Sequence, residues 1–443
     1  MDVSSTIASQ IKKWSLDKSK KRLFQNFFSL SALQASNYIF ALITLPYLVR
    51  VLGPEKYGLI AFAQAFTGYF QILTEYGFNL SATRQVAIHR ENKDKLNQIF
   101  STVMLIKLGL LVLSSILLTI LVFSISKFIQ QWPIYYLTFG MVLAQTLFPV
   151  WLFQGMESMK YITLVNVLSR FIFTVLVFIV IRSEADYLMV PLLNFLGMLV
   201  GALISLYVVF KVFRIRFIFP HYHEIIFQLK EGWHIFISTV AISLYTVSNS
   251  FILGIFTNNT IVGYYSAAER IIKAIQALIT PISQSIYPFI SNLIQQSKET
   301  AIRFISKVLK VIGISSFLFS LFIFLFAPFI VKLVLGNQFY PSVVVLRILS
   351  FLPFIILISN ILGIQTMLNF GYQKPFSRII ISASLINIVL LFILTPLFSL
   401  VGTASSVLVS ELFVTISMYI FLRKQHIHLI HIEPFKVVSR DTR

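Results

Sequence analysis

Long apolar stretches separated by short polar ones dominate the chain. A membrane-spanning helix needs about 20 predominantly apolar residues, and twelve stretches reach that length. Their approximate ranges are 27–49, 57–82, 99–124, 132–154, 161–181, 187–210, 233–256, 260–290, 309–334, 342–370, 376–397 and 401–422. The pattern therefore predicts an all-α polytopic membrane protein with twelve transmembrane helices.

The longest polar interruption between spans divides these helices into two equal sets. It reads "KVFRIRFIFPHYHEIIFQLKEGW" and follows the sixth span. We therefore predict two bundles of six helices, residues 27–210 and 233–422, joined by a linker at 211–232. Basic segments, residues 1–26 and 423–443, are predicted to flank them.

Composition supports membrane embedding and explains the strong positive charge. The chain is 57% hydrophobic and 12% charged, whereas soluble domains have about 25% charged residues. The net charge of +20 would suggest nucleic acid in a soluble protein. Here Lys and Arg lie mostly in short loops, where they determine membrane orientation, so we predict no nucleic-acid partner.

The distribution of the 36 Lys and Arg residues predicts the orientation. Five lie within spans, and five lie in the loops opposite the N-terminus, which leaves 26 on the N-terminal side. The opposite-side residues are Arg50, Lys56, Lys127, Arg182 and Lys332. Basic loops remain on the cytoplasmic face. Both termini and the linker are therefore predicted to be cytoplasmic, with the chain in the cytoplasmic membrane.

A short repeat supports the division into halves. "YGLIAFAQA", residues 57–65, aligns with "VGYYSAAER", residues 262–270, with Gly58 and Gly263 at the same position. Each segment follows a span and a polar turn. If each half begins and ends on the cytoplasmic side, the halves form a parallel repeat, as in many transporters.

The eighth span carries three charges that a membrane helix would normally avoid. Glu269 and Lys273 are four residues apart, which is an ion-pair spacing on a helix, and Arg270 and Lys273 are three apart. Gln276 extends the same face. Intramembrane charges usually mark functional sites, and this cluster has one excess positive charge. It is predicted to be a cationic site for an anionic ligand, with a helix-packing ion pair as the alternative.

Other charged residues lie inside predicted spans. Arg170 is near the middle of the fifth span, Lys107 lies in the third and Arg347 near the outer end of the tenth. We predict that these cations join the cationic site, although Lys107 and Arg347 could instead reach an interface by snorkelling. Glu411 and Glu75 are either structural ion-pair partners or sites that couple transport to an ion.

The sequence argues against several catalytic classes. It has no cysteine, no GxxxxGK[ST] motif and no H-E-x-x-H motif. All five Asp residues lie in tails or loops, which argues against a D-x-D glycosyltransferase. The "HIHLIH" tract follows the last span into a tail. We therefore predict a protein that is not an enzyme and binds neither a metal nor a cofactor, apart from Na⁺ or H⁺ as a coupling ion.

Two segments resemble the bacterial polysaccharide and O-antigen repeat-unit flippases of the multidrug/oligosaccharidyl-lipid/polysaccharide exporter superfamily. They are "LPYLVRVLGPEKYGLIAFAQAFTGYFQILTEYGFNLSATRQVA" in the first two spans and "LKEGWHIFISTVAISLYTVSNSFILGIFTNNTIVGYYSAAERI" in the seventh and eighth. The resemblance implies a V-shaped pair of six-helix bundles around a central cavity. It also implies that an undecaprenyl-pyrophosphate-linked oligosaccharide is flipped to the outer leaflet by alternating access, for lipopolysaccharide or another surface polysaccharide.

The resemblance also gives the charged residues their expected roles. It implies a cation-bearing cavity at Arg270 and Lys273, extended by Arg170 and Lys107, with Arg347 and Gln276 as further candidates. Glu269, Glu411 and Glu75 become the candidates for ion coupling. A lipid-linked oligosaccharide, membrane lipids, a polysaccharide polymerase and a chain-length regulator become the expected partners.

Two other functions remain compatible with the pattern. An ion-coupled multidrug exporter of the same superfamily would share the fold, but such exporters typically carry cations and would favour an acidic cavity. A membrane-embedded polymerase would need a long outer loop with catalytic residues, and all the predicted outer loops are short.

Overall fold

The computed structural model describes residues 3–277 and 280–429; most side chains before residue 39 and several between 241 and 288 fall outside this description. The described chain is helical throughout, with no strand. In the described residues, all twelve predicted spans lie on helices. Most of the predicted C-terminal segment, 423–443, lies outside the described residues.

The N-terminal half contains eight α-helices and two short helices of other types. Together they cover the first six predicted spans. Their bounds are α1 (Val3–Glu75), α2 (Phe78–Ile88), α3 (Lys93–Ser124), α4 (Ser126–Ile129), α5 (Trp132–Leu147), α6 (Val150–Gly155), α7 (Met159–Val180), η1 (Glu184–Leu188), α8 (Met189–Tyr207) and η2 (Val208–Val212).

The C-terminal half begins with a helix that bridges the two halves. Helix α9 starts inside the predicted linker, packs on α2 and α3, and then reaches α16. The bounds here are α9 (Tyr222–Thr246), α10 (Ser248–Phe256), α11 (Asn259–Ala277), α12 (Thr280–Gln296), α13 (Lys298–Val334), η3 (Asn337–Phe339), α14 (Ser342–Leu349), α15 (Leu352–Asn360), η4 (Ile361–Leu368) and α16 (Gln373–Lys424).

Helix α16 contains two predicted spans, and α1 contains the first predicted span and most of the second; several single spans are broken. Helix α1 turns at Gly53 (φ 67°) and α16 at Ser399 (φ 53°). Glycine adopts positive φ without steric cost, which suits the tight turn at Gly53. The fourth span is interrupted before Pro149, since proline cannot donate the next helical hydrogen bond.

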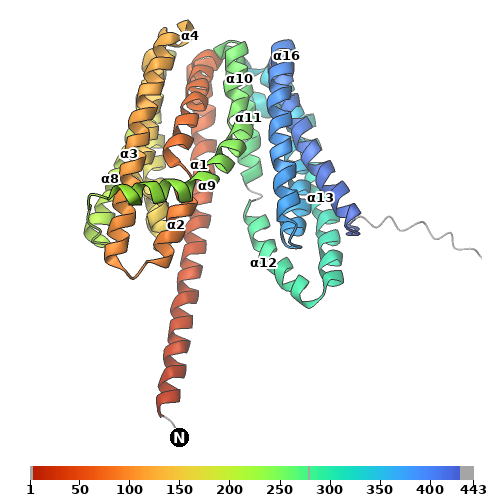
Figure 1. The fold of residues 1–443 in the computed structure, drawn as a ribbon. Helices are drawn as coiled ribbons and strands as arrows, with labels where there is room; N and C mark the ends of the chain where they lie inside the picture. Colours follow the sequence, from red (N-terminus) through yellow and green to blue (C-terminus); the bar gives the residue numbers. More distant parts are fainter. Residues whose placement is uncertain (1–2, 278–279, 430–443) are drawn as a thin grey trace, which may run out of the picture.

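The packing of apolar side chains produces a V shape (Figure 1). At one end, a single core cluster joins both halves through residues such as Leu52, Phe62, Tyr265 and Leu335. Toward the other end, each half has its own apolar cluster. One surrounds Trp151 in the N-terminal half, and the other lies entirely within the C-terminal half. The molecule is therefore closed at one end and open at the other, and α1 enters from the open end.

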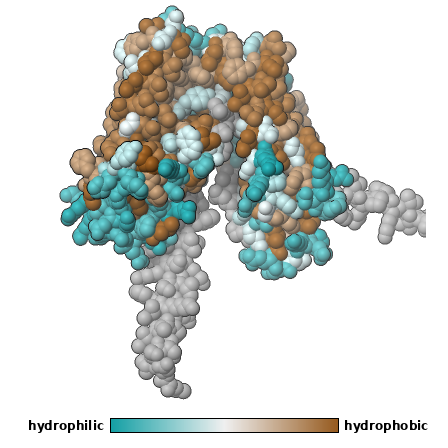
Figure 2. Space-filling view, in the orientation of Figure 1, coloured by the Kyte–Doolittle hydropathy of each residue, from teal (hydrophilic) through white to brown (hydrophobic). Residues whose placement is uncertain are grey.

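The outer flanks of both halves are apolar. Exposed large side chains follow α3, α7, α13 and α16. Figure 2 shows a broad hydrophobic band above hydrophilic tips on the face in view. Exposed apolar surface on this scale indicates contact with lipid. Among the described residues, seven helical segments are long and apolar enough to cross a membrane, and the longest, Gln373–Lys424, contains two predicted spans. The protein is a multi-pass membrane protein.

The closed end depends on two glycines that occupy equivalent positions in the sequence repeat. Gly58 lies against the carbonyl oxygen of Asn259, and Gly263 lies against the carbonyl oxygen of Pro54; a Cβ on either glycine would overlap that backbone atom. Helices α1 and α11 can therefore approach closely only where both residues lack a side chain. The repeat read from the sequence is thus the crossing point of the two halves.

Candidate functional site

Two adjoining cavities lie near the junction of the halves. The larger, of about 430 Å³, is lined mainly by helices of the N-terminal half, and the smaller, of about 270 Å³, lies between α1, α10 and α11. Gln64 and Arg270 line both. A ligand placed at these two side chains can therefore extend into either cavity.

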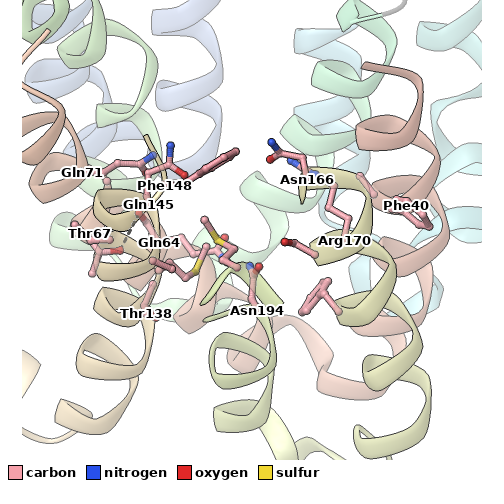
Figure 3. Close-up of a pocket in the computed structure, with 18 of the residues that line it drawn as sticks. Phe40, Gln64, Thr67, Gln71, Thr138, Gln145, Phe148, Asn166, Arg170 and Asn194 are labelled. Atoms are coloured by element: carbon pink, nitrogen blue, oxygen red, sulfur yellow. Dashed lines mark hydrogen bonds between the residues drawn. The ribbon is translucent and has the colours of Figure 1, made fainter. Parts of the chain in front are cut away.

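The larger cavity is lined by an unusual number of side-chain amides, and we call it the amide cavity. Five amides from four helices contribute: Gln64, Gln71, Gln145, Asn166 and Asn194. Figure 3 shows Gln64, Thr67, Gln71 and Gln145 on one side and Asn166 and Arg170 on the other, with Asn194 between them. Arg170 and Arg270 are its charged lining residues.

A carboxylate and a buried amine hold one wall of the amide cavity in place. Gln71 and Gln145 each donate their side-chain NH₂ to Glu75 Oε1, at 3.4 Å. Lys107 lies behind this wall, only 2% exposed, and interacts electrostatically with Glu75. A nearby opposite charge stabilises a buried cation, and Glu75 itself joins the two amides that face the cavity.

The other amides differ in how much of their hydrogen-bonding capacity is used. Asn166 donates to the carbonyl oxygen of Ile162 on its own helix. The side chains of Gln64 and Asn194 have no hydrogen-bond partner among the described residues, and both are partly accessible. These two amides therefore present both a donor and an acceptor group to whatever occupies the cavity.

The smaller cavity holds the predicted charge cluster on α11, and we call it the charged cavity. Lys273 Nζ lies 3.0 Å from Glu269 Oε1, so the predicted ion pair is present. Arg270 Nη1 donates to the hydroxyl of Tyr57 across the two halves, at 3.3 Å. Arg270 and Lys273 are both solvent-exposed although they lie deep between the halves. The cavity is therefore open to water, as the stability of these charges requires.

The structure separates the predicted site residues into three groups. Arg170, Arg270, Lys273 and Glu269 line one or both cavities. Lys107 and Glu75 form the support behind the amide cavity, so the expectation that Lys107 lines the cavity is corrected. It failed because the Lys107 side chain is buried in the protein interior, where Glu75 interacts with it electrostatically.

The remaining candidates lie away from both cavities. The Arg347 guanidinium packs over the Phe324 ring at 5.5 Å, which corrects its expected place in the cationic cavity. Gln276 is half-buried beyond the two linings, since the helical face turns away one turn below Lys273. Glu411 lines a separate pocket of about 210 Å³ inside the C-terminal half.

The amide cavity was not predicted, although the sequence contains a signal for it. Gln64, Thr67 and Gln71 are spaced by three and four residues, and Thr138 and Gln145 by seven. Such spacing places polar groups on one face of an apolar helix. These stripes are neutral, so they lack the signal of an intramembrane charge, and only tertiary packing brings them together.

Comparison with known proteins gives consistent matches along most of the chain. The family model described as "Polysaccharide biosynthesis protein" matches residues 23–294. A "Putative O-antigen transporter" of Escherichia coli (strain K12) is 38% identical over 408 residues, covering 92% of this chain and 98% of that protein. Another of that description, from Shigella dysenteriae, is 27% identical over 394 residues, covering 89% and 98%.

Solved structures with the same fold include flippases and multidrug transporters. The lipid II flippase MurJ, in an inward closed conformation, aligns with a TM-score of 0.69 at 14% identity, covering 90% of this chain and 87% of that one. An inward-facing MATE-family multidrug transporter aligns at 0.63 and 15% identity (87% and 94% covered), and an outward-facing one at 0.56 and 16% (90% and 95% covered). At such identities the likeness shows the fold, a pair of helical bundles around a central cavity.

Proposed function

The chain belongs to the polysaccharide biosynthesis protein family, and from this premise we propose that it is a flippase for a lipid-linked oligosaccharide. Its substrate would be a repeat unit of O-antigen or another surface polysaccharide, carried on undecaprenyl pyrophosphate. The protein would move it from the inner to the outer leaflet of the bacterial cytoplasmic membrane, and then a polymerase and a chain-length regulator would act on it.

The observation that supports this proposal best is the composition of the two adjoining cavities. The charged cavity offers Arg270 and Lys273 in contact with water, and Glu269 balances only one of these charges. A pyrophosphate bears several negative charges and must exchange its hydration for charge-assisted hydrogen bonds as it crosses the membrane. Cations between the halves supply those bonds.

Alternating access accounts for the two ends of the V. If the basic loops place the N-terminal side in the cytoplasm, the open end faces inward and would admit the headgroup there. The close α1–α11 crossing would then seal the outer side. Outward release would require this crossing to separate, while the polyprenyl chain stays in the lipid beside the apolar flanks.

An ion gradient is the proposed energy source. Glu269 pairs with Lys273 in the charged cavity, so a substrate phosphate would compete with the carboxylate for this amine. Binding of a proton or Na⁺ at Glu269 would release Lys273 for the substrate. Glu269 is therefore the first candidate for ion coupling, ahead of Glu75 and Glu411.

The multidrug-exporter alternative fits the fold but not the cavities. An organic cation would be repelled by Arg170, Arg270 and Lys273. The five amides suit a hydroxyl-rich ligand better than an apolar one. The flippase proposal accounts for both the cations and the amides.

The test removes the two cations and measures surface polysaccharide in a flippase-deleted strain. Losing a charge-assisted hydrogen bond of about 1.5–3 kcal/mol weakens binding about ten- to hundredfold. Arg270→Ala/Lys273→Ala should therefore abolish surface polysaccharide, and Arg270→Lys should be intermediate because it keeps the charge without the two-pronged geometry.

A matched control removes two cations elsewhere. Arg182→Ala/Lys332→Ala changes two helix ends away from both cavities and should restore full polysaccharide, with protein amounts compared by immunoblot. If the Arg270→Ala/Lys273→Ala protein is present at normal amounts and still restores full-length polysaccharide, the proposed cationic site is wrong.

A further inference from the structure

We propose that the amide cavity is the binding site for the sugar residue directly attached to the pyrophosphate, and that Gln64 and Asn194 are its main specificity determinants. This inference rests on the proposed function, because it assumes a pyrophosphate at Arg270. It assigns separate roles to the two cavities: the charged cavity binds the phosphates, and the amide cavity recognises the sugar.

The first support is the position of Arg270 and Gln64 at the junction. Both side chains line both cavities. A phosphate that accepts hydrogen bonds from Arg270 therefore has its next substituent within reach of Gln64 and, beyond it, of the other amides. A volume of about 430 Å³ falls within the range of about 300–1,000 Å³ that is usual for small-molecule sites.

The second support is the chemistry of the lining. A sugar hydroxyl both donates and accepts a hydrogen bond, and a carboxamide can do the same. Because the Glu75 carboxylate can only accept, the NH₂ groups of Gln71 and Gln145 must point to it, and their carbonyl oxygens remain to accept from a ligand. The wall thus presents acceptors, while Gln64 and Asn194 present donors as well.

The third support is the apolar part of the same cavity. Phe40, Phe148 and Phe173 lie among the polar groups, and Figure 3 shows Phe40 and Phe148 on different sides. A pyranose ring has apolar C–H faces and a polar rim. Aromatic side chains between convergent amides match that shape, as in small-molecule sites generally.

A purely structural role does not explain Gln64 and Asn194. Amides that hold helices together would hydrogen-bond a neighbouring helix, yet these two have no partner among the described residues. Polar groups that a ligand satisfies are effective for specificity, since an analogue without the matching hydroxyl leaves them unpaired. Replacing the two amides should therefore alter sugar recognition and leave phosphate recognition unchanged.

The experiment compares two lipids on the purified protein in nanodiscs. One is undecaprenyl pyrophosphate alone, and the other is the lipid-linked repeat unit that accumulates in a flippase-deleted host. Dissociation constants are measured for wild type and for Gln64→Met/Asn194→Leu, which replaces each amide by an apolar side chain of similar size. Gln130→Met makes the same chemical change at an exposed amide outside both cavities and serves as the control.

Wild type should bind the sugar-bearing lipid more tightly than the bare pyrophosphate lipid. The double variant should lose about five- to hundredfold of its affinity for the sugar-bearing lipid, as expected for two neutral hydrogen bonds. Its affinity for the bare lipid should stay within about twofold of wild type, which also shows that the variant is folded. The Gln130→Met protein should match wild type for both lipids.

Three results would count against the inference. If the double variant keeps the wild-type ratio of affinities, the sugar binds elsewhere. If it loses affinity for both lipids equally, the amides are not specific to the sugar. If wild type binds neither lipid while remaining folded, the proposed function itself is wrong, which distinguishes that failure from the other two.

Discussion

The two halves of the molecule share a scaffold but differ in the chemistry of their interiors. The N-terminal half encloses the amide cavity, with five carboxamides and Arg170. The pocket of the C-terminal half is smaller and lined mostly by apolar residues such as Ile356, Phe376 and Met418, with Glu411 at its wall. In the proposed flippase, the repeated scaffold would supply the opening and closing, and the amide cavity of the N-terminal half would supply ligand recognition.

At the closed end, by contrast, the two halves contribute alike to the glycine crossing. Each supplies one glycine to the α1–α11 crossing. Two cations of the N-terminal half add contacts to helix C-termini of the other half: Arg50 donates to the carbonyl oxygen of Leu333, and Lys127 to those of Gly254 and Thr257. Cations are favourable at helix C-termini, so these contacts stabilise the closed end.

The largest effect is expected from filling the glycine crossing. Gly58→Leu and Gly263→Leu should each abolish transport, because either side chain overlaps the backbone of the other half and prevents closure. Equal losses would confirm that the halves are equivalent here. Gly109→Leu is the matched control, since an added Cβ meets no atom there within 4 Å.

Accessibility distinguishes a failure to close from a failure to fold. The chain has no cysteine, so Ser250→Cys in the charged cavity provides a single reactive site. A membrane-impermeant maleimide added outside cells should label this residue strongly only when Gly58 or Gly263 carries a leucine. Unchanged labelling in a stably inserted leucine variant would contradict the assigned role of the crossing.

A smaller effect is expected behind the amide cavity. Lys107→Met removes the buried amine that faces Glu75. Breaking a fully buried ion pair costs about 3–5 kcal/mol; because Lys107 and Glu75 interact electrostatically without a salt-bridge contact and Glu75 is half-buried, we expect a smaller loss, of about 1 kcal/mol. The purified variant should melt at a lower temperature and bind the sugar-bearing lipid less tightly.

The matched double variant tests whether the pair is the cause. Lys107→Met/Glu75→Gln removes both charges and should regain most of the stability, because no buried charge is left alone. It should not regain sugar affinity fully, since Gln71 and Gln145 would no longer face a carboxylate. Additive losses in the double variant would show that the two side chains act independently.

Much of the scaffold could be predicted from the sequence, because span length and the charge cluster on α11 are local signals. The expected all-helical fold, with the twelve predicted spans on helices in the described residues, and the Glu269–Lys273 ion pair are confirmed. The orientation and the role of each charge stay predictions.

Lys107 could not be assigned, because whether an intramembrane amine faces a cavity or a carboxylate depends on how α3 packs against α1. Asn166 and Asn194 were not predicted as site residues, because each is a single amide in its span. Their place in the cavity depends on amides from other helices.

The smallest effect is expected from Glu411, and it separates the two halves with respect to ion coupling. Glu411 lies in the C-terminal pocket, away from both cavities, whereas Glu269 pairs with Lys273 in the charged cavity. If coupling depends on competition between carboxylate and substrate phosphate for Lys273, only Glu269→Gln should remove the response of transport to an imposed proton or Na⁺ gradient. Glu411→Gln keeps the shape of the side chain and should change the transport rate in vesicles by no more than about twofold, a difference of about 0.4 kcal/mol. Both variants should be compared at equal protein density, with the lipid-linked repeat unit as substrate. Loss of the gradient response in Glu411→Gln, with Glu269→Gln behaving as wild type, would transfer the coupling site to the C-terminal half.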